Sequence, residues 1–89
     1  MRIFRWDIEK NNLLISERGI SFEEIVFHIE SGHLLDIVPG KGKYVHQKQF
    51  IVEVGHYAHI VPFIETADEI FLKTIIPSRE MTKKYLRGG

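Results

Sequence analysis

The chain has 89 residues, of which 44% are hydrophobic, with one Trp, three Tyr, six Phe, no cysteine and a formal net charge of zero. This composition suits a single folded domain over residues 1–89 and argues against disorder. The lack of cysteine excludes a disulfide framework, thiolate zinc sites and a cysteine nucleophile. No apolar run approaches the ~20 residues that span a bilayer, and the first residues do not form a signal-peptide pattern. We therefore expect a cytoplasmic protein with no membrane partner.

The charge is unevenly distributed along the chain. Residues 70–89 carry five basic side chains and one acidic side chain, a net +4, whereas residues 1–69 carry seven basic and eleven acidic ones, a net −4. A basic end on an acidic body suggests a polyanion or an acidic partner at the C-terminus. The alternative is a solvated final helix whose lysines complement the helix dipole, and charge alone favours this plainer interpretation.

The N-terminal part begins with an alternating segment at residues 2–6, which predicts a short strand or an extended lead-in. Asp7 can then cap a helix that runs to about Arg18 and ends at Gly19. The apolar face of this helix is weak. It is nevertheless bounded at both ends by residues typical of helix caps.

The second helix has a stronger pattern. Ser21 and Glu24 form a capping box, and Ser31-Gly32 ends the segment. Between them, apolar residues recur at the spacing that places them on one helical face. These residues are Phe22, Ile25, Val26 and Ile29.

The second half of the chain predicts strands. Residues 33–38 are a short apolar stretch that can form one strand, and residues 49–54, 57–64 and 69–76 are joined by short turns, as in an antiparallel meander. Pro62 lies inside the middle strand and has no N–H to donate, so a bulge or an exposed edge is expected there. A short helix follows. The predicted class is therefore α+β, with two N-terminal helices packed on a small antiparallel sheet and a short C-terminal helix.

The five histidines raise the question of a metal site. His56 and His59 are three residues apart, a spacing that directs strand side chains to opposite faces. No cysteine or acidic cluster completes a ligand set. We therefore expect no metal and no other cofactor, and a small metalloenzyme is a distant third hypothesis.

One metal-free chemistry is compatible with these side chains. RNA carries its own nucleophile, the 2′-hydroxyl, so a protein can cleave it with a proton acceptor, a proton donor and cations for the phosphate. Each candidate also has a plainer interpretation, such as His46 as a surface loop residue and Glu53 on the solvent face of a strand. The candidates are His46, Lys48, Glu53, Arg79, Lys83 and Tyr85.

Two segments resemble a known family. Residues 4–11 (Phe-Arg-Trp-Asp-Ile-Glu-Lys-Asn) and 18–24 (Arg-Gly-Ile-Ser-Phe-Glu-Glu) look like the opening of BrnT-type toxins, where Trp-Asp-x-x-Lys leads to Gly-Val-Ser-Phe-Glu-Glu. Residues 75–82 (Ile-Ile-Pro-Ser-Arg-Glu-Met-Thr) resemble the Ile-Ser-Ala-Arg-Arg-Ala-Thr signature that follows the last strand of that family. With the strands between them, the resemblance covers nearly the whole chain.

The resemblance implies a RelE-like fold and the ribonuclease toxin of a type II toxin–antitoxin pair. It implies RNA as substrate, free or on the ribosome, and a cognate antitoxin with a ribbon–helix–helix or similar DNA-binding domain. Arg79 matches the signature arginine, whose guanidinium can hold a phosphate bidentately.

From this we predict two groups of site residues. The catalytic group is His46, Lys48, Glu53 and Arg79, and the RNA-binding group is Lys73, Arg79, Lys83, Lys84 and Tyr85. The alternative is a non-catalytic partner of a DNA-binding antitoxin, in which the same cations receive an acidic antitoxin segment.

Overall fold

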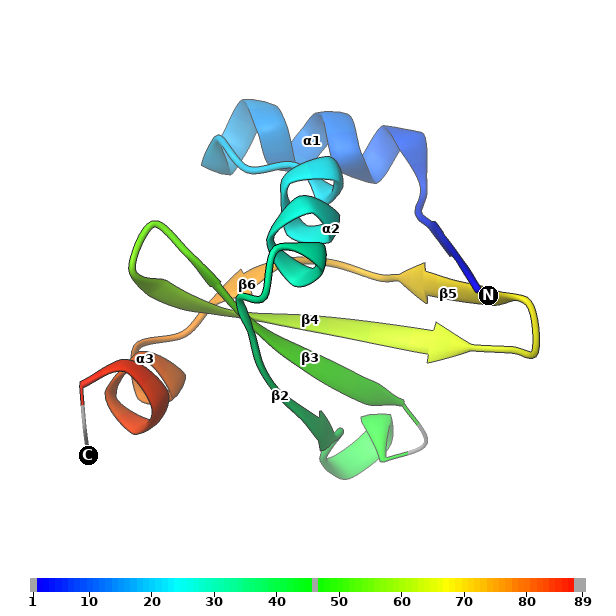
Figure 1. Cartoon of the computed structure of the whole chain (residues 1–89). Helices are drawn as coiled ribbons and strands as arrows, with labels where there is room; N and C mark the ends of the chain where they lie inside the picture. Colours follow the sequence, from blue (N-terminus) through cyan, green and yellow to red (C-terminus); the bar gives the residue numbers. More distant parts are fainter. Residues whose placement is uncertain (1, 46, 88–89) are drawn as a thin grey trace.

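The computed structural model describes residues 2–45 and 47–87, and it combines three α-helices with a six-stranded sheet (Figure 1). The predicted α+β class is confirmed. None of the helices in this described part of the chain is long and apolar enough to cross a membrane. Along the chain the elements are β1 (Ile3–Arg5), α1 (Ile8–Arg18), α2 (Phe22–Glu30), β2 (Leu34–Pro39), the 3-10 helix η1 (Gly42–Tyr44), β3 (Lys48–Val54), β4 (Tyr57–Glu65), β5 (Glu69–Leu72), β6 (Ile76–Pro77) and α3 (Arg79–Leu86).

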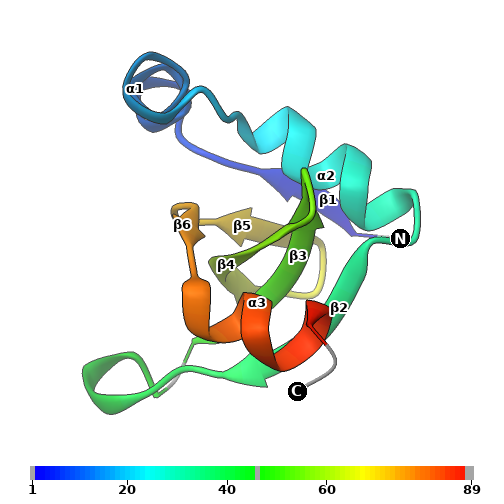
Figure 2. The same cartoon turned by 90° about the vertical axis from the view of Figure 1, so that its left-hand side faces the viewer.

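The sheet is mixed rather than purely antiparallel. Its strand order is β1-β5-β4-β3-β2, and β6 pairs with β4 outside this path. All pairs are antiparallel except that of β1 with β5. Parallel strands cannot be joined by a tight turn, and here two helices and three strands lie between β1 and β5 along the chain. The helices α1 and α2 lie on one side of the sheet and α3 on the other (Figure 2).

The first helix begins and ends as its capping residues predict. The Asp7 side chain accepts a hydrogen bond from the backbone N–H of Glu9, and Gly19 ends the helix in the left-handed region at φ 67°. Asn11, in the middle of α1, is buried: its amide oxygen accepts from the N–H of Phe22 at 2.8 Å, and its amide nitrogen donates to Glu23 at 2.7 Å. Asn11 thereby fixes the first turn of α2 against α1.

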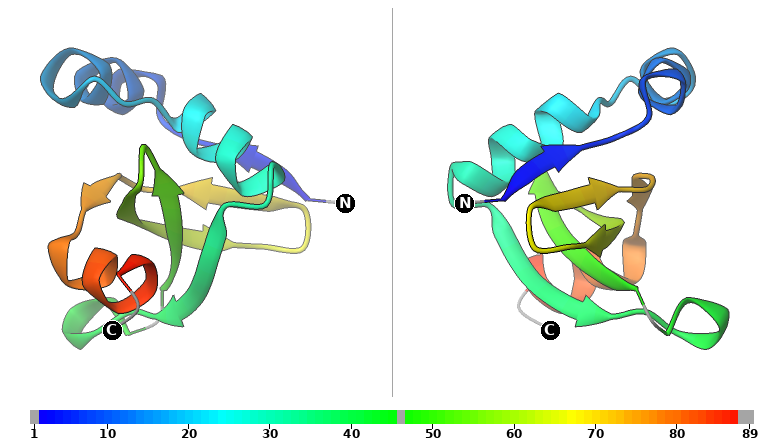
Figure 3. Two further views of the ribbon diagram at one scale, coloured as in Figure 1. Left: turned by 60° about the vertical axis from the view of Figure 1, so that its left-hand side comes forward. Right: turned by 90° about the vertical axis from the view of Figure 1, so that its right-hand side faces the viewer.

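The second helix carries the main apolar face of the core. The capping box of Ser21 and Glu24 is present in both directions. Phe22 and Ile25 are fully buried, and α2 lies across the sheet in both views of Figure 3. The buried core cluster comprises Leu14, Ile20, Phe22, Ile25, Phe50, Val52, Val61, Phe63, Leu72 and Ile75.

The last predicted strand is broken into two. β5 pairs with β4 as far as Leu72. The chain then continues alongside β4 and pairs with it again as β6, where Pro77 lies opposite His59. Pro62 lies between these two paired stretches, and its carbonyl accepts the N–H of Lys73 at 2.8 Å. The N–H and C=O of one strand residue point to the same side, so the N–H that Pro62 lacks would have pointed toward the stretch between β5 and β6. No strand residue in the described part of the chain pairs with Pro62 on that side of β4, so no ladder hydrogen bond is lost. The proline is therefore accommodated without a bulge in the register of β3 with β4.

The C-terminal helix is attached to β4 through the backbone of Ala58. The Ala58 carbonyl accepts the N–H of Ser78 at 2.9 Å, and the Ala58 N–H donates to the Thr82 hydroxyl at 2.8 Å. That hydroxyl in turn donates to the Ser78 carbonyl at 2.7 Å. Both Ala58 and Thr82 are buried. We call this set of bonds the Ala58 clamp.

The Ala58 clamp yields a stability prediction. Replacing Thr82→Val keeps the shape of the side chain but leaves the buried N–H of Ala58 without a partner, which should cost about 1–3 kcal/mol of unfolding free energy. Thr82→Ser retains the hydroxyl and should cost less. Urea unfolding of the three proteins measures the difference, and a valine variant as stable as wild type would show that the clamp contributes nothing.

Candidate functional site

The C-terminal helix presents three cations on one face. Arg79 and Lys83 in α3 and Arg87 just after it are spaced by four residues, so their side chains stack along one side of the helix. With Tyr57 and Thr82 they line a cavity of about 390 Å³. We call this the cationic cavity.

The three cations of the cationic cavity have no partner among residues 2–45 and 47–87. By contrast, Arg2, Arg5, Lys48 and His56 each lie within ion-pair distance of a carboxylate. Like charges at a spacing of four residues repel one another on a helix. An anion bound in the cavity would relieve this repulsion, so the arrangement favours a ligand with negative charge.

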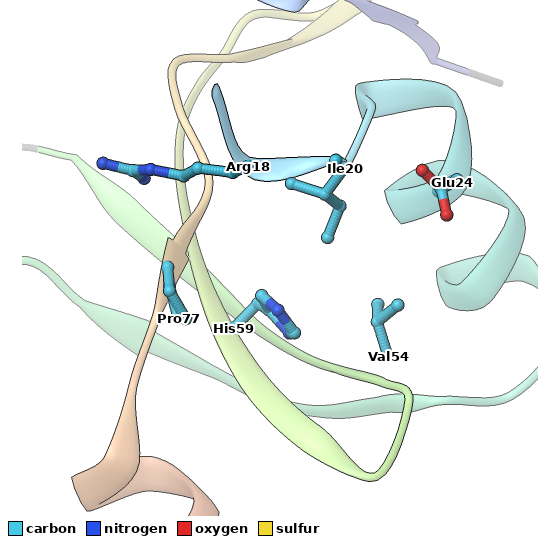
Figure 4. Close-up of a pocket in the computed structure, with 7 residues that line it drawn as sticks. Arg18, Ile20, Glu24, Val54, His59 and Pro77 are labelled. Atoms are coloured by element: carbon cyan, nitrogen blue, oxygen red, sulfur yellow. The ribbon is translucent and has the colours of Figure 1, made fainter. Parts of the chain in front are cut away.

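A second cavity of about 460 Å³ lies beside the hairpin of β3 and β4 (Figure 4). Ile20 from the loop between the helices, Val54 at the end of β3 and Pro77 from β6 form apolar walls, and the ring of His59 projects between them. Arg18 stands at the rim, where its Nη1 donates to the Ile75 carbonyl at 2.7 Å. We call this the apolar cavity.

His59 is the titratable group at the floor of the apolar cavity. Its Nδ1 lies 3.0 Å from the Tyr57 carbonyl. Because a carbonyl only accepts, Nδ1 carries the proton in the neutral ring and Nε2 is left unprotonated. Burial lowers the pKa of His59 below its ordinary value of 6.5, outweighing the Tyr57 and Val52 carbonyls, which raise it. The ring is therefore neutral at pH 7 and can accept a proton.

The two cavities meet at the start of β4. The rings of Tyr57 and His59 contact each other edge to face with centroids 5.9 Å apart, and the first lines the cationic cavity while the second lines the apolar one. Across the ladder, Pro77 is the register partner of His59, and Arg79 follows two residues later. The Ala58 clamp lies between these pairs. It therefore fixes the cations of α3 relative to the rings of β4.

The structure brings together two of the predicted RNA-binding residues, Arg79 and Lys83, and separates the others. Lys84 and Tyr85 point to the opposite side of α3, where the Tyr85 hydroxyl donates to Asp36 of β2. This bond lowers the pKa of Asp36 and raises that of Tyr85. Tyr85 thus anchors α3 to β2. Lys73 lies over a ring of β5, 5.5 Å from its centroid.

The remaining catalytic candidates lie away from Arg79. Lys48, at the beginning of β3, pairs with Glu65 at 2.6 Å, and Arg2 pairs with the same carboxylate. Glu53, near the other end of β3, lies 3.6 Å from the His56 ring. Glu53 lies five residue steps along the strand from Lys48, roughly 17 Å away. The structure therefore does not unite these two side chains in one site, and the prediction for His46 lies outside the described residues.

The sequence predictions named only Arg79 and Lys83 among the residues that line the two cavities, and they missed Arg18, Tyr57, His59 and Arg87 among others. The spacing of Arg79, Lys83 and Arg87 was visible in the sequence and would have identified Arg87 as the third cation of the face. The proximity of Tyr57 and His59 to that helix was not visible, because it depends on the pairing of β6 with β4. Within the described residues, no three His, Asp or Glu side chains gather closely enough to hold a metal ion.

The comparisons with known proteins concern the fold. No protein-family model matches the sequence, and no curated protein is similar enough to count as a match. A solved structure of a mutant of YafQ from E. coli is similar over 91% of this chain and 98% of that chain, with a TM-score of 0.54 and 12% identity. The fold is therefore RelE-like, as predicted. This similarity does not single out the BrnT type.

The burial of His59 predicts how stability depends on pH. Its folded-state pKa is depressed, so its contribution is present above the unfolded pKa of about 6.5 and is lost as the pH falls through the folded value. Wild type should lose unfolding free energy between pH 7.5 and 5.5, and His59→Gln should lose less. His33→Gln, at an exposed position, is the matched control and should behave like wild type. Equal pH dependence of all three proteins in urea unfolding would contradict the assignment.

Proposed function

We propose that this protein is the toxin of a type II toxin–antitoxin pair and cleaves cytoplasmic RNA through the 2′-hydroxyl without a metal. The observation that carries the proposal is the cationic cavity, in which Arg79, Lys83 and Arg87 have no partner among the described residues and lie beside Tyr57. The RelE-like fold supports the same interpretation. RNA affinity comes largely from cations that neutralise phosphates, and these three side chains provide them on one concave surface.

The proposed chemistry assigns one role to each part of the site. Arg79 and Lys83 hold the scissile phosphate, and the guanidinium can bind two of its oxygens at once. Nε2 of His59 takes the proton of the 2′-hydroxyl, the 2′-oxygen attacks phosphorus, and the bond from phosphorus to the 5′-oxygen breaks. The leaving oxygen takes up a proton from water or from the Lys83 ammonium. The products are a 2′,3′-cyclic phosphate and a 5′-hydroxyl.

The partner in this proposal is an antitoxin with a ribbon–helix–helix or similar DNA-binding domain. An acidic segment of the antitoxin would occupy the cationic cavity, because covering the RNA site is the simplest way to silence the toxin. The alternative function is a non-catalytic partner of that antitoxin. The zero net charge of the whole chain favours this alternative, since strong RNA binding usually accompanies a basic surface.

The first functional prediction concerns Arg79. Wild type induced alone should arrest growth and cleave RNA, and Arg79→Ala should lower cleavage at least about tenfold, because it removes a charge-assisted contact with the phosphate. The Tm should change little, since Arg79 is exposed. Arg5→Ala removes a second exposed arginine, one paired with Glu69, and should cleave like wild type.

Wild-type protein that is harmless in cells and leaves purified RNA intact, with and without ribosomes, would refute the ribonuclease proposal. The non-catalytic alternative would then stand if the protein still binds an antitoxin. Lys48 and Glu53 stay predictions, and the same assay tests them as Lys48→Ala and Glu53→Gln.

The second functional prediction concerns metals. Cleavage should persist in EDTA, because the RNA supplies its own nucleophile and the proposed groups are a histidine and cations. The measurement is the cleavage rate before and after chelation, with added magnesium or zinc as the reverse test. A rate that collapses in EDTA and recovers with either metal would contradict the proposed chemistry.

A further inference from the structure

We propose that the apolar cavity binds one unpaired nucleobase of the RNA, next to the phosphate held in the cationic cavity. The inference rests on the proposed function and adds a second subsite to it. The protein would then select single-stranded RNA through a base as well as through phosphate charge.

The walls of the apolar cavity suit the faces of a base. Val54 and Pro77 leave apolar surface uncovered around a space of about 460 Å³, the buried Ile20 closes one side of it, and the His59 ring projects into it (Figure 4). Flat aromatic bases bury their faces against such apolar and aromatic surfaces when they leave the helical stack. Apolar walls on several sides of one open cavity therefore favour a flat, largely apolar ligand.

The rim of the apolar cavity offers a polar group for the edge of a base. Arg18 uses Nη1 on the Ile75 carbonyl, which leaves its other N–H groups as donors. Glu24 accepts from the Ser21 N–H and hydroxyl through Oε1 alone, and its Oε2 has no hydrogen-bond partner among residues 2–45 and 47–87. Glu24 and Arg18 lie at opposite sides of the cavity, and the Arg18 guanidinium is directed away from it (Figure 4). Glu24 is therefore the group placed to accept a hydrogen bond from the edge of a nucleobase, which carries both donors and acceptors.

The apolar cavity also lies at a suitable position relative to the phosphate. Pro77 is the cross-strand neighbour of His59, and such neighbours lie about 5 Å apart. Arg79 follows two residues later, about 7 Å along an extended chain. Tyr57 bridges the two cavities through its ring contact with His59. A phosphate on Arg79 therefore places the attached nucleoside beside the opening of the apolar cavity.

Base pairing would prevent this mode of binding. In a duplex the base is stacked on both faces and its pairing edge is occupied, so it would have to be flipped out at a cost of a few kcal/mol. The proposal therefore predicts a preference for single strands that the cationic cavity alone does not create.

The test compares two short single-stranded RNAs by fluorescence anisotropy. Both carry a central 2′-deoxynucleotide, which removes the nucleophile and prevents cleavage there, and one of them lacks the central base. Wild type should bind the complete RNA roughly fivefold or more tightly than the abasic one, because stacking of one base has about that effect. Annealing the complete RNA to its complement should also weaken binding.

Two variants assign the effect to the cavity. Val54→Phe fills the space from its wall and should bring the ratio of the two affinities close to one. Val45→Phe, at an exposed position after η1, makes the same change elsewhere and should retain the wild-type ratio. Melting temperatures confirm that both variants are folded.

The outcomes separate the two proposals. If wild type binds both RNAs equally while Arg79→Ala weakens both, the base subsite is wrong and the phosphate site stands. If wild type binds neither RNA, the proposed function fails together with the subsite. A wild-type preference that persists in folded Val54→Phe places base recognition elsewhere and overturns the inference.

Discussion

The candidate site depends on the Ala58 clamp, the hydrogen bonds that join the backbone of β4 to the beginning of α3. The carbonyl of buried Ala58 accepts a hydrogen bond from the Ser78 N–H, and the Ala58 N–H donates one to the Thr82 hydroxyl. The neighbours of Ala58 on β4 are Tyr57 and His59. The neighbours of Ser78 and Thr82 on α3 are the cations Arg79 and Lys83. A buried N–H that loses its partner is costly, so the alignment of rings and cations is as fixed as this part of the core.

The clamp also holds charges in a position that local helix preferences disfavour. Arg79 is the first residue of α3, where the partial positive charge of the helix dipole makes a cation unfavourable by about 0.3–1 kcal/mol. Lys83 and Arg87 add repulsion along the same face. Departures from local preference concentrate at functional sites, where another constraint decides the residue. A phosphate or a carboxylate bound between these three cations supplies such a constraint.

Local patterns predicted the helices well because their signals are short-range. Asp7, Gly19 and the capping box of Ser21 with Glu24 act within one turn of the chain, and each appears as predicted. The crossing from β5 to β6 was not predictable. It depends on the gap beside Pro62 and on pairing with residues sixteen or more positions earlier in the chain. The sequence therefore predicted one continuous strand where the chain forms two.

The same distinction explains the site. Arg79 was predicted because it matches the signature arginine of the resembling family, and Lys83 because a basic segment is visible in the sequence. Lys84 and Tyr85 were grouped with them, although helical geometry directs them to β2. His59 was considered only with His56 as a metal pair. Its role became visible only when β6 placed Pro77 and α3 beside it.

The most direct test of a single RNA site at the clamp is an NMR titration of the isotope-labelled protein with a short non-cleavable RNA. Amide signals of Tyr57 to His59 on β4 and of Arg79 to Lys83 on α3 should shift together and saturate at one RNA concentration. Shifts confined to Lys48 and Glu65, to the Lys84 and Tyr85 side of α3, or to two surfaces that saturate separately would contradict a site built on the Ala58 clamp.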